Sequence, residues 1–167
     1  MIKNMKLKMI ETLELEPLHG EGGFFKRTYC STEFVEAKTI SGKLVKRPKS
    51  TSILFLVGGE DFSALHKLEF DEVFSFNDGD PCKMFLIDDK GSGHTVILGR
   101  DIAKGEKAHF TVPAGWLQGL RSLGEWSLVS ASMMPGFDYE DFSMPNRADL
   151  IKKYPSLEKE IKAYTRD

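Results

Sequence analysis

The feature that most constrains the fold of this chain is a series of short strand-like segments between about Phe24 and Pro135. Runs rich in Phe, Val, Ile and Thr alternate with Gly, Asp, Asn and Pro, as strands alternate with turns. No helical pattern interrupts the series, so it predicts an all-β fold with a closed or double antiparallel sheet, such as a jelly roll. The predicted strands are residues 24–30, 51–57, 62–69, 72–76, 83–87, 95–98, 108–112, 116–120 and 126–133.

Both ends of the chain carry helical patterns instead, which predict a short N-terminal helix and C-terminal helices packed outside the barrel. Between the first two strands, residues 35–49 are polar and Lys-rich, which indicates a surface loop or an edge hairpin. The N-terminal helix is predicted from Ile2, Met5, Met9 and Leu13, which recur at helical spacing. At the other end, Asn146 is the predicted N-cap of a helix over residues 147–153. Ser156 is the predicted cap of a second helix, in which Leu157, Ile161 and Tyr164 share a face.

Composition excludes several classes of protein. The 167 residues are 41% apolar and 29% charged, which predicts one soluble domain spanning residues 1–167. The net charge is −2 with scattered Lys and Arg, which argues against a nucleic-acid partner. No apolar stretch is long enough to cross a membrane, and lysines interrupt the first ten residues, where a signal peptide would be apolar. Cys30 and Cys82 match neither a disulfide framework nor a zinc pair, so we expect a reduced, cytoplasmic protein.

One predicted interior face combines apolar residues with two ionisable groups. Period-two alternation places His66 on one face with Phe62, Ala64 and Leu68, and places Glu72 on one face with Phe74 and Phe76. Burying an ionisable group without a partner costs several kcal/mol, so such groups pair, bind a ligand or face a wet cavity. A His–Glu hydrogen bond without any ligand also explains this pattern.

Three stretches of the sequence form recognisable motifs. Residues 19–25 read His-Gly-Glu-Gly-Gly-Phe-Phe, residues 62–66 read Phe-Ser-Ala-Leu-His, and residues 135–142 read Pro-Gly-Phe-Asp-Tyr-Glu-Asp-Phe. Together they resemble a poorly characterised branch of the cupin superfamily, and the resemblance continues through Gln118 and Arg121 to the helical tail. It implies a double-stranded β-helix (the cupin jelly-roll barrel), commonly a homodimer, with a ligand pocket at the barrel mouth.

The same resemblance implies a metal site that this chain carries incompletely. The first cupin metal motif reads Gly, His-x-His, Glu, Gly, and Leu68 stands at its second His. The second motif reads Pro-x-Gly followed by a His; residues 113–115 match, but Gln118 takes the place of the His. The remaining set is His66, Glu72 and Gln118. A neutral amide oxygen is a weak ligand for zinc or iron, so we expect a zinc, nickel, manganese or iron ion to bind loosely at best.

Two functions follow from these residues. In the first, the pocket binds a small polar metabolite, sugar- or acid-like, and catalyses isomerisation, epimerisation or a lyase-type proton transfer. His66 acts as the base, Glu72 orients it, and Tyr29 or Arg27 stabilises developing charge. In the alternative, the protein is a non-catalytic cupin that binds a small molecule or a metal. The predicted ligand-binding residues are Arg27, Glu21, Trp116, Gln118 and Arg121.

Overall fold

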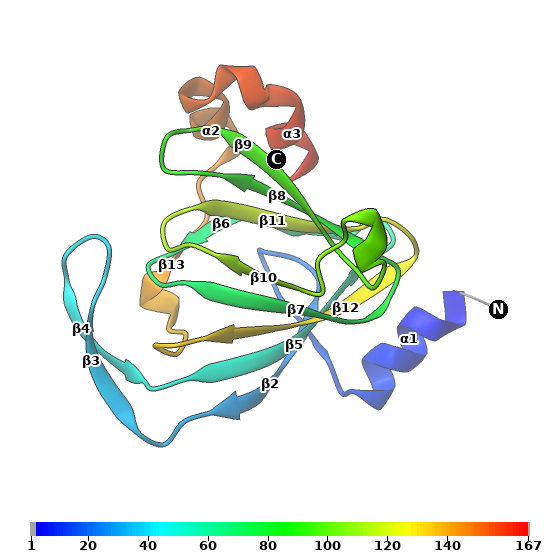
Figure 1. Ribbon diagram of the computed structural model, residues 1–167, viewed down its shortest axis with the longest axis horizontal. Helices are drawn as coiled ribbons and strands as arrows, with labels where there is room; N and C mark the ends of the chain where they lie inside the picture. The colour runs from blue at the N-terminus through cyan, green and yellow to red at the C-terminus, as the bar shows by residue number, and fades with distance from the viewer. Residues whose placement is uncertain (1–2, 167) are drawn as a thin grey trace.

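Two antiparallel sheets lie face to face in the computed structural model, which describes residues 3–166 (Figure 1). The larger sheet has the order β1-β2-β5-β12-β7-β10, the smaller β13-β6-β11-β8-β9, and β3 and β4 form a separate hairpin. The strands are β1 (Glu16–Pro17), β2 (Phe24–Cys30), β3 (Phe34–Lys38), β4 (Leu44–Pro48), β5 (Thr51–Gly58), β6 (Ser63–Leu68), β7 (Glu72–Gly79), β8 (Cys82–Ile87), β9 (Gly93–Leu98), β10 (His109–Val112), β11 (Leu117–Ser122), β12 (Trp126–Met133) and β13 (Phe142–Ser143).

Every predicted strand is present in this fold. The bounds of β2 and β12 are those predicted, and β7 runs three residues past the predicted end at Phe76. Residues 35–49 form most of the β3–β4 hairpin, one of the two structures expected for them. The two-residue strands β1 and β13 were not predicted, because so short a pairing leaves no alternating pattern in the sequence.

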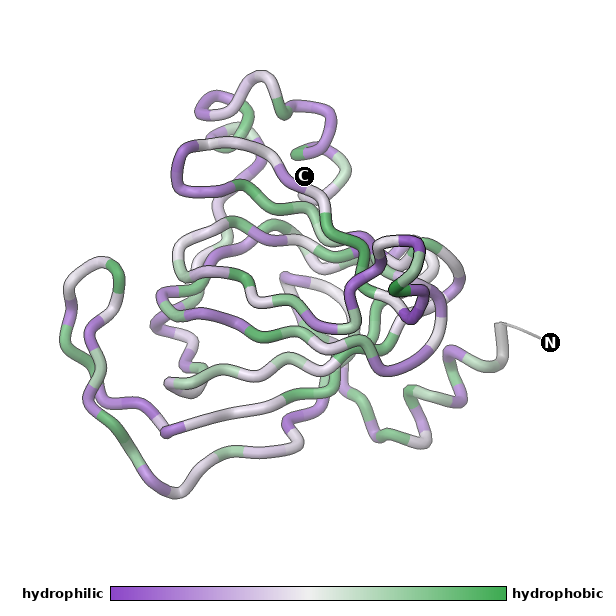
Figure 2. The backbone as a smooth tube through the Cα atoms, in the orientation of Figure 1, coloured by the Kyte–Doolittle hydropathy of each residue, from purple (hydrophilic) through white to green (hydrophobic). Residues whose placement is uncertain are grey.

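The main core fills the space between the two sheets. Figure 2 shows apolar segments interleaved with polar ones along the strands of both sheets, as alternation requires. Cys82 belongs to this core, and burial raises the pKa of its thiol to about 12; Cys30 is exposed and also unpaired. The core comprises Phe55, Val57, Phe74, Val112, Val129 and Ala131 from the larger sheet, with Cys82, Met84, Leu86, Leu98 and Leu120 from the smaller.

Helices cover the outer faces of both sheets. Helix α1 (Lys3–Thr12) lies against the larger sheet, and α2 (Arg147–Lys153) and α3 (Glu158–Ala163) lie against the smaller one (Figure 1). Asn146 caps α2 as predicted, accepting a hydrogen bond from the Asp149 amide at 2.8 Å. The cap predicted at Ser156 is wrong, because a 3₁₀ turn over Pro155–Leu157 precedes α3. The contribution of Ile2 lies outside the described residues.

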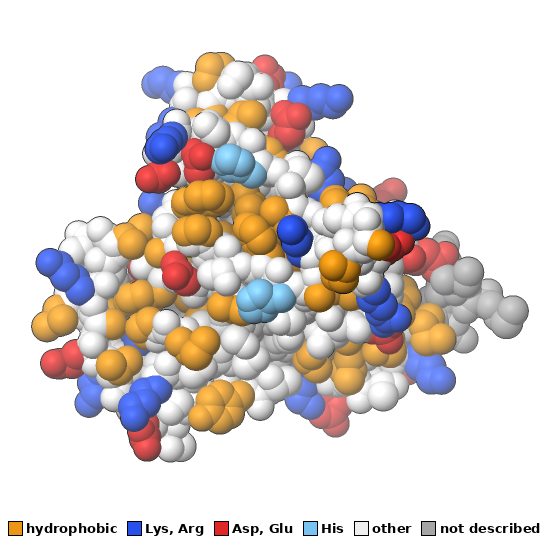
Figure 3. Space-filling model, viewed as in Figure 1, with side chains coloured by type: hydrophobic (Ala, Val, Ile, Leu, Met, Phe, Trp, Pro, Cys, Tyr) orange, Lys and Arg blue, Asp and Glu red, His pale blue; other side chains and the backbone are white. Residues whose placement is uncertain are grey.

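The surface carries charges of both signs. On the face seen in Figure 3, acidic and basic side chains are intermixed, and apolar side chains lie among them. Large exposed apolar residues include Phe34, Ile40 and Leu44 on or beside the β3–β4 hairpin. None of the helices within residues 3–166 has the length and apolar character to cross a membrane.

A β-bulge in β6 decides which of its residues face the interior. Gln118 on β11 pairs with His66, but two residues later Leu120 pairs with Ser63, so β6 carries one extra residue. The bulge reverses the alternation on its N-terminal side. Phe62 was predicted to share the interior face with His66, but the guanidinium groups of Arg121 and Arg166 lie over its ring, 4.0 and 4.1 Å from the ring centroid.

Candidate functional site

A cavity of about 110 Å³ lies between the sheets. Residues from all three sequence motifs (19–25, 62–66 and 135–142) line it. This volume is several times what one water molecule needs, so the cavity can hold a small organic molecule. Its mouth is formed by the exposed residues His19, Arg27 and Tyr139. Its inner end holds the ionisable side chains Glu21, His66 and Glu72 together with Ser63.

His66 is held in one orientation by two contacts. Its Nδ1 lies 2.8 Å from the backbone oxygen of Ala64, two residues earlier, a geometry that the β6 bulge permits. Its ring stacks on Phe142, with 5.2 Å between the ring centroids. Because a carbonyl oxygen only accepts, Nδ1 carries the proton of the neutral ring, and the lone pair is on Nε2. No residue within 3–166 forms a hydrogen bond with Nε2, which leaves that lone pair to a ligand.

Glu72 is a buried acid that connects the two sheets. It begins β7 in the larger sheet, and its Oε2 accepts a hydrogen bond of 2.7 Å from Nε2 of Gln118 on β11 in the smaller sheet. Burial raises the pKa of Glu72 to about 7, against the lowering effects of His66 and of the Gln118 hydrogen bond; the Glu21 carboxylate adds to the increase. Glu72 therefore keeps its proton up to near neutral pH.

Glu21 reaches the cavity because the glycines after it let its loop approach β6. Gly22 has φ +98°, and a Cβ there would lie 2.3 Å from the backbone oxygen of Phe62, so only glycine fits. The Glu21 carbonyl accepts from the amide of Ala64, and its side-chain Oε1 accepts from Ser63 Oγ at 2.6 Å. This oxygen also lies 3.8 Å from Nδ1 of His66.

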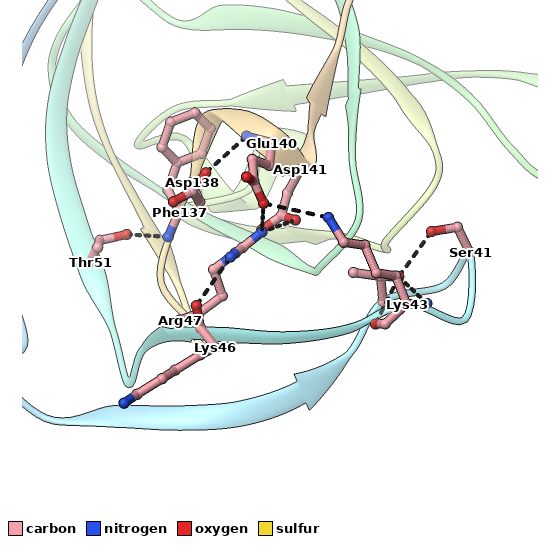
Figure 4. A network of polar contacts seen from close by, with 10 residues as sticks. Ser41, Lys43, Lys46, Arg47, Thr51, Phe137, Asp138, Glu140 and Asp141 are labelled. Atoms are coloured by element: carbon pink, nitrogen blue, oxygen red, sulfur yellow. Dashed lines mark hydrogen bonds and ion pairs between the residues drawn. The ribbon is translucent and has the colours of Figure 1, made fainter.

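Residues 135–142 cover one end of the cavity and are fixed by a buried arginine. Arg47 on β4 donates from Nε and Nη2 to the two carboxylate oxygens of Asp141, at 2.7 and 2.9 Å (Figure 4). Its Nη2 also donates to Glu140 at 3.1 Å. The amide of Phe137 donates to Thr51 Oγ1 at 2.9 Å. These contacts place the rings of Phe137, Tyr139 and Phe142 along the cavity.

Comparison with known proteins places this architecture in a family. Residues 7–145 match the family described as "Cupin superfamily (DUF985)". The chain belongs to the cupin superfamily. This match covers most of the chain, and it agrees with the double-sheet jelly-roll fold of the structure. The predicted fold, with its N-terminal and C-terminal helices, is confirmed.

Several relatives are similar to this cupin over most of its length. The uncharacterized protein YML079W of Saccharomyces cerevisiae is 27% identical over 153 residues, covering 84% of this chain and 76% of the relative. A hypothetical protein from Leishmania major has a TM-score of 0.87 at 31% identity, covering 96% of this chain and 98% of that one. Protein SO0799 from Shewanella oneidensis has a TM-score of 0.84 at 32% identity, covering 95% and 96%.

A more distant likeness concerns the fold alone. The oxalate decarboxylase of Bacillus subtilis, a protein with Mn(II) centres, has a TM-score of 0.54 at 13% identity. The match covers 91% of this cupin but only 38% of that chain. It supports the shared barrel and carries no reaction across to this protein.

The structure brings some predicted site residues to the cavity and leaves others away from it. Glu21, Arg27, His66 and Glu72 line the cavity, and Gln118 lies behind Glu72 as its hydrogen-bond partner. Three predicted residues do not line it: Tyr29, Trp116 and Arg121.

Local features of the chain explain why these three residues do not line the cavity. A register shift between Arg27 and Tyr29 in β2 breaks the expected alternation, and Tyr29 is 55% exposed. Trp116, in the turn before β11, stacks on His94 with 5.4 Å between the ring centroids. Arg121 points outward and donates from Nε to the carbonyl of Ala163 at 2.8 Å.

Sequence reasoning missed several residues of the site. Ser63 was not singled out, because alternation from His66 points it outward and nothing in the sequence marks the β6 bulge. His19 had no assigned role, and it is exposed at the mouth of the cavity. Phe137, Tyr139 and Phe142 stood within a motif that had no assigned role, and their aromatic spacing was the signal that could have found them.

The donor atoms present do not fit the metal ion that cupin motifs imply. Gln118 presents its Nε2–H to Glu72, so its amide nitrogen, which cannot bind a metal, faces that carboxylate. Its Oε1 is buried without a hydrogen-bond partner among the described residues. Within residues 3–166, no group of three or more His, Cys, Asp and Glu side chains is placed to share an ion. Of the set that the cupin motifs imply, one imidazole and one hydrogen-bonded carboxyl group remain, which are too few ligands for a zinc or iron site.

Proposed function

We propose that this cupin binds a small polar metabolite in the cavity and catalyses a proton transfer on it, as in isomerisation, epimerisation or a lyase-type step. The observation that carries the proposal is the pairing of a base and an acid at the inner end. The hydrogen bond from Nδ1 to Ala64 leaves the His66 lone pair on Nε2, and burial keeps Glu72 protonated up to near neutral pH.

The proton balance of such a step uses only these two groups. Nε2 of His66 removes a proton from the carbon beside a carbonyl group, while the Glu72 carboxyl group gives its proton to the carbonyl oxygen. The product of this half-reaction is a neutral enol, with His66 protonated and Glu72 ionised. Returning the protons to a different carbon or to the opposite face gives an isomer or an epimer and restores both groups.

Two other side chains have supporting roles in this proposal. Glu21, whose Oε1 lies 3.8 Å from Nδ1 of His66, stabilises the imidazolium ion that forms during the step. Arg27 at the mouth takes a group of the ligand that points outward. Tyr29, predicted to stabilise developing charge, lies away from the cavity lining and has no part in the proposal.

A binding protein without turnover is the second candidate. The observation that favours it is the large aromatic share of the cavity wall, which includes five Phe rings. Both candidates keep the cytoplasmic location and the homodimer as predictions, and a sedimentation measurement tests the latter.

The first prediction is that the protein catalyses exchange of a carbon-bound hydrogen for deuterium. We would incubate a panel of hydroxyketones, aldoses and keto acids in D₂O and follow deuterium uptake by NMR and mass spectrometry. His66→Asn should reduce the uptake at least ~100-fold, since general acid–base catalysis contributes that much or more. Asn retains a side-chain N–H that can donate to the Ala64 carbonyl, which protects the fold. Glu72→Gln should cause a similar loss.

The matched control is His109→Ala, since His109 is an exposed residue of β10 outside the cavity lining. Uptake that persists in His66→Asn would contradict the assignment of the base. Binding of a compound from the panel without any exchange in the wild type would favour the second candidate.

A further inference from the structure

We infer that the cavity takes its ligand with a hydrogen-bond donor, a hydroxyl or amino group, at the inner end and with a flat apolar body between aromatic rings. The inference concerns the cavity of the proposed function and names the ligand class that it admits. It holds whether or not the ligand is turned over.

The inner end of the cavity presents acceptor atoms. The side chain of Glu21 is 14% exposed, and its Oε1 already accepts from Ser63. No hydrogen bond within residues 3–166 uses its Oε2, and this oxygen, which belongs to a residue that lines the cavity, is not fully buried. The same holds for Nε2 of His66. Oε1 of Glu72 also lacks a hydrogen bond among the described residues, and it becomes an acceptor when this acid loses its proton above about pH 7. A hydroxyl or amino group satisfies such acceptors, and hydrogen bonds to an ionised carboxylate are the stronger kind.

An anionic group cannot take this place without a large cost. The described residues that line the inner end include two carboxyl groups and no Lys or Arg. A ligand carboxylate or phosphate there would meet the Glu21 carboxylate at short range, in surroundings where burial already raises the pKa of Glu72 to about 7. Two negative groups in such a site disfavour each other, as the effect of Glu21 on Glu72 indicates.

The walls fit a flat apolar body. The rings of Phe25, Phe55, Phe74, Phe137 and Phe142 all line the cavity, and Phe142 already stacks on the His66 imidazole. Aromatic faces favour stacking with rings and with the apolar face of a cyclic molecule, and they also attract a cation. The faces therefore add to the preference of the inner end for an amine or an alcohol.

The mouth of the cavity differs in charge from the inner end. Arg27 is the single Lys or Arg among the described lining residues, and it is exposed at the rim. An acidic ligand could satisfy Arg27 only with its carboxylate pointing outward. Of the two ligand types expected from the sequence, a hydroxyl-bearing, sugar-like molecule fits this distribution better than one that enters with its acid group first.

The test compares three ligands of similar size, benzyl alcohol, benzylamine and benzoate, at one pH near 7.5. Their dissociation constants are measured with ligand-observed NMR on the full chain. We expect the alcohol and the amine to compete with one another and to bind at least tenfold more tightly than benzoate. Benzoate binding as tightly as the amine, or binding of the amine and the alcohol without competition, would overturn the inference.

The conservative variant Glu21→Gln tests whether the Glu21 carboxylate causes the preference for the amine over benzoate. Glu21→Gln keeps an oxygen that can accept from Ser63 but removes the charge, so benzylamine affinity should fall about tenfold and benzyl alcohol affinity by less. The control Glu36→Gln, on the exposed strand β3, should change neither. Equal amine affinity in Glu21→Gln and in wild type would remove Glu21 from the site.

These outcomes separate the two proposals. If the amine and the alcohol bind in the expected order but no compound exchanges a proton, the inference stands and the catalytic proposal fails. If exchange occurs only on compounds that enter with a carboxylate inward, so that benzoate competes and benzyl alcohol does not, the catalytic proposal stands and the inference fails.

Discussion

At the scale of single residues, the buried pair Glu72 and Gln118 decides most of the chemistry. Glu72 is a buried residue (9% exposed), so ionising its carboxyl group has a high cost, and one amide donor at 2.7 Å offsets only part of that cost. The acid instead stays protonated to near neutral pH. Gln118 therefore has a role that its position in the metal motif does not indicate. It donates a hydrogen bond to the buried Glu72 carboxyl group from behind the cavity.

The pKa of Glu72 predicts a specific dependence of stability on pH. In the unfolded chain this group has a pKa near 4.5, and in the folded protein about 7. Below pH 4.5 Glu72 is protonated in both the folded and the unfolded protein, so its burial lowers the free energy of unfolding least there. Between pH 4.5 and 7 only the unfolded state loses its proton, so the free energy of unfolding falls as the pH rises, and it levels off above pH 7.

Glu72→Gln should remove this dependence. Between pH 5 and pH 8 the free energy of unfolding of wild type should decrease by about 2 to 3 kcal/mol relative to that of the variant. Urea denaturation at several pH values measures the difference, and Glu36→Gln on β3 serves as the control. Parallel curves for wild type and Glu72→Gln would show that Glu72 ionises in the folded protein as it does in the unfolded chain.

At the scale of elements, local patterns were enough to find the longer strands of both sheets and the helix α2 with its Asn146 cap. They failed where the chain departs from regular geometry. The bulges in β2 and β6 move Tyr29 and Phe62 off the interior face, and neither segment contains a Gly or Pro that would mark the extra residue. The register of a strand depends on its neighbours in the sheet, and those are distant in sequence.

The buried arginine on β4 is the element-level support of the cavity. Replacing Arg47 with Met leaves the Asp141 carboxylate, whose side chain is 2% exposed, without its partner. Removing one member of such a pair costs about 3–5 kcal/mol, and we expect a loss of this size in the free energy of unfolding. Since Asp141 lies next to Phe142, benzyl alcohol affinity should fall as well.

The control for Arg47→Met is Lys43→Met. Lys43 pairs with Glu140 at 3.6 Å in the same network, but both side chains are more than 60% exposed, so its loss should change little (Figure 4). Joint replacement of Arg47 and Asp141 by Met and Leu should recover part of the lost stability, because the unpaired charge is then gone. Equal stability of Arg47→Met and Lys43→Met in urea denaturation would contradict this account.

At the scale of the whole molecule, the cavity is closed by contacts between segments far apart in the sequence. Arg47 joins β4 to residues 135–142, and Arg166 near the C-terminus joins α3 to the loop of Glu21. No short-range pattern could predict either contact, although the family resemblance included the Glu21 loop, residues 135–142 and the helical tail. The cavity therefore depends on contacts between distant segments of the folded chain, whereas the strands around it are determined by local sequence patterns.

Arg166 predicts how the Glu21 loop depends on the C-terminus. Its guanidinium group donates to the carbonyl of Glu21, to the carbonyl of Phe62 at 2.7 Å and to Asp61 Oδ1 at 2.8 Å. Asp61 in turn accepts from the amide of Gly23 at 2.8 Å. Arg166→Met removes all of these donors at once, so the loop should open more often while the two sheets stay folded.

Amide hydrogen exchange measures this opening directly. The amides of Gly22, Gly23 and Ala64, each bonded within or to the Glu21 loop, should exchange roughly tenfold faster in Arg166→Met, since hydrogen bonds to a charged group are worth about 1.5–3 kcal/mol. Amides at the centre of β12 should be unchanged, and Arg100→Met, which loses an exposed ion pair with Asp78, should leave the loop as it is. Faster exchange throughout both sheets would mean that Arg166 stabilises the whole barrel rather than the loop. Unchanged exchange would mean that Gly22 and Gly23 hold Glu21 in place on their own.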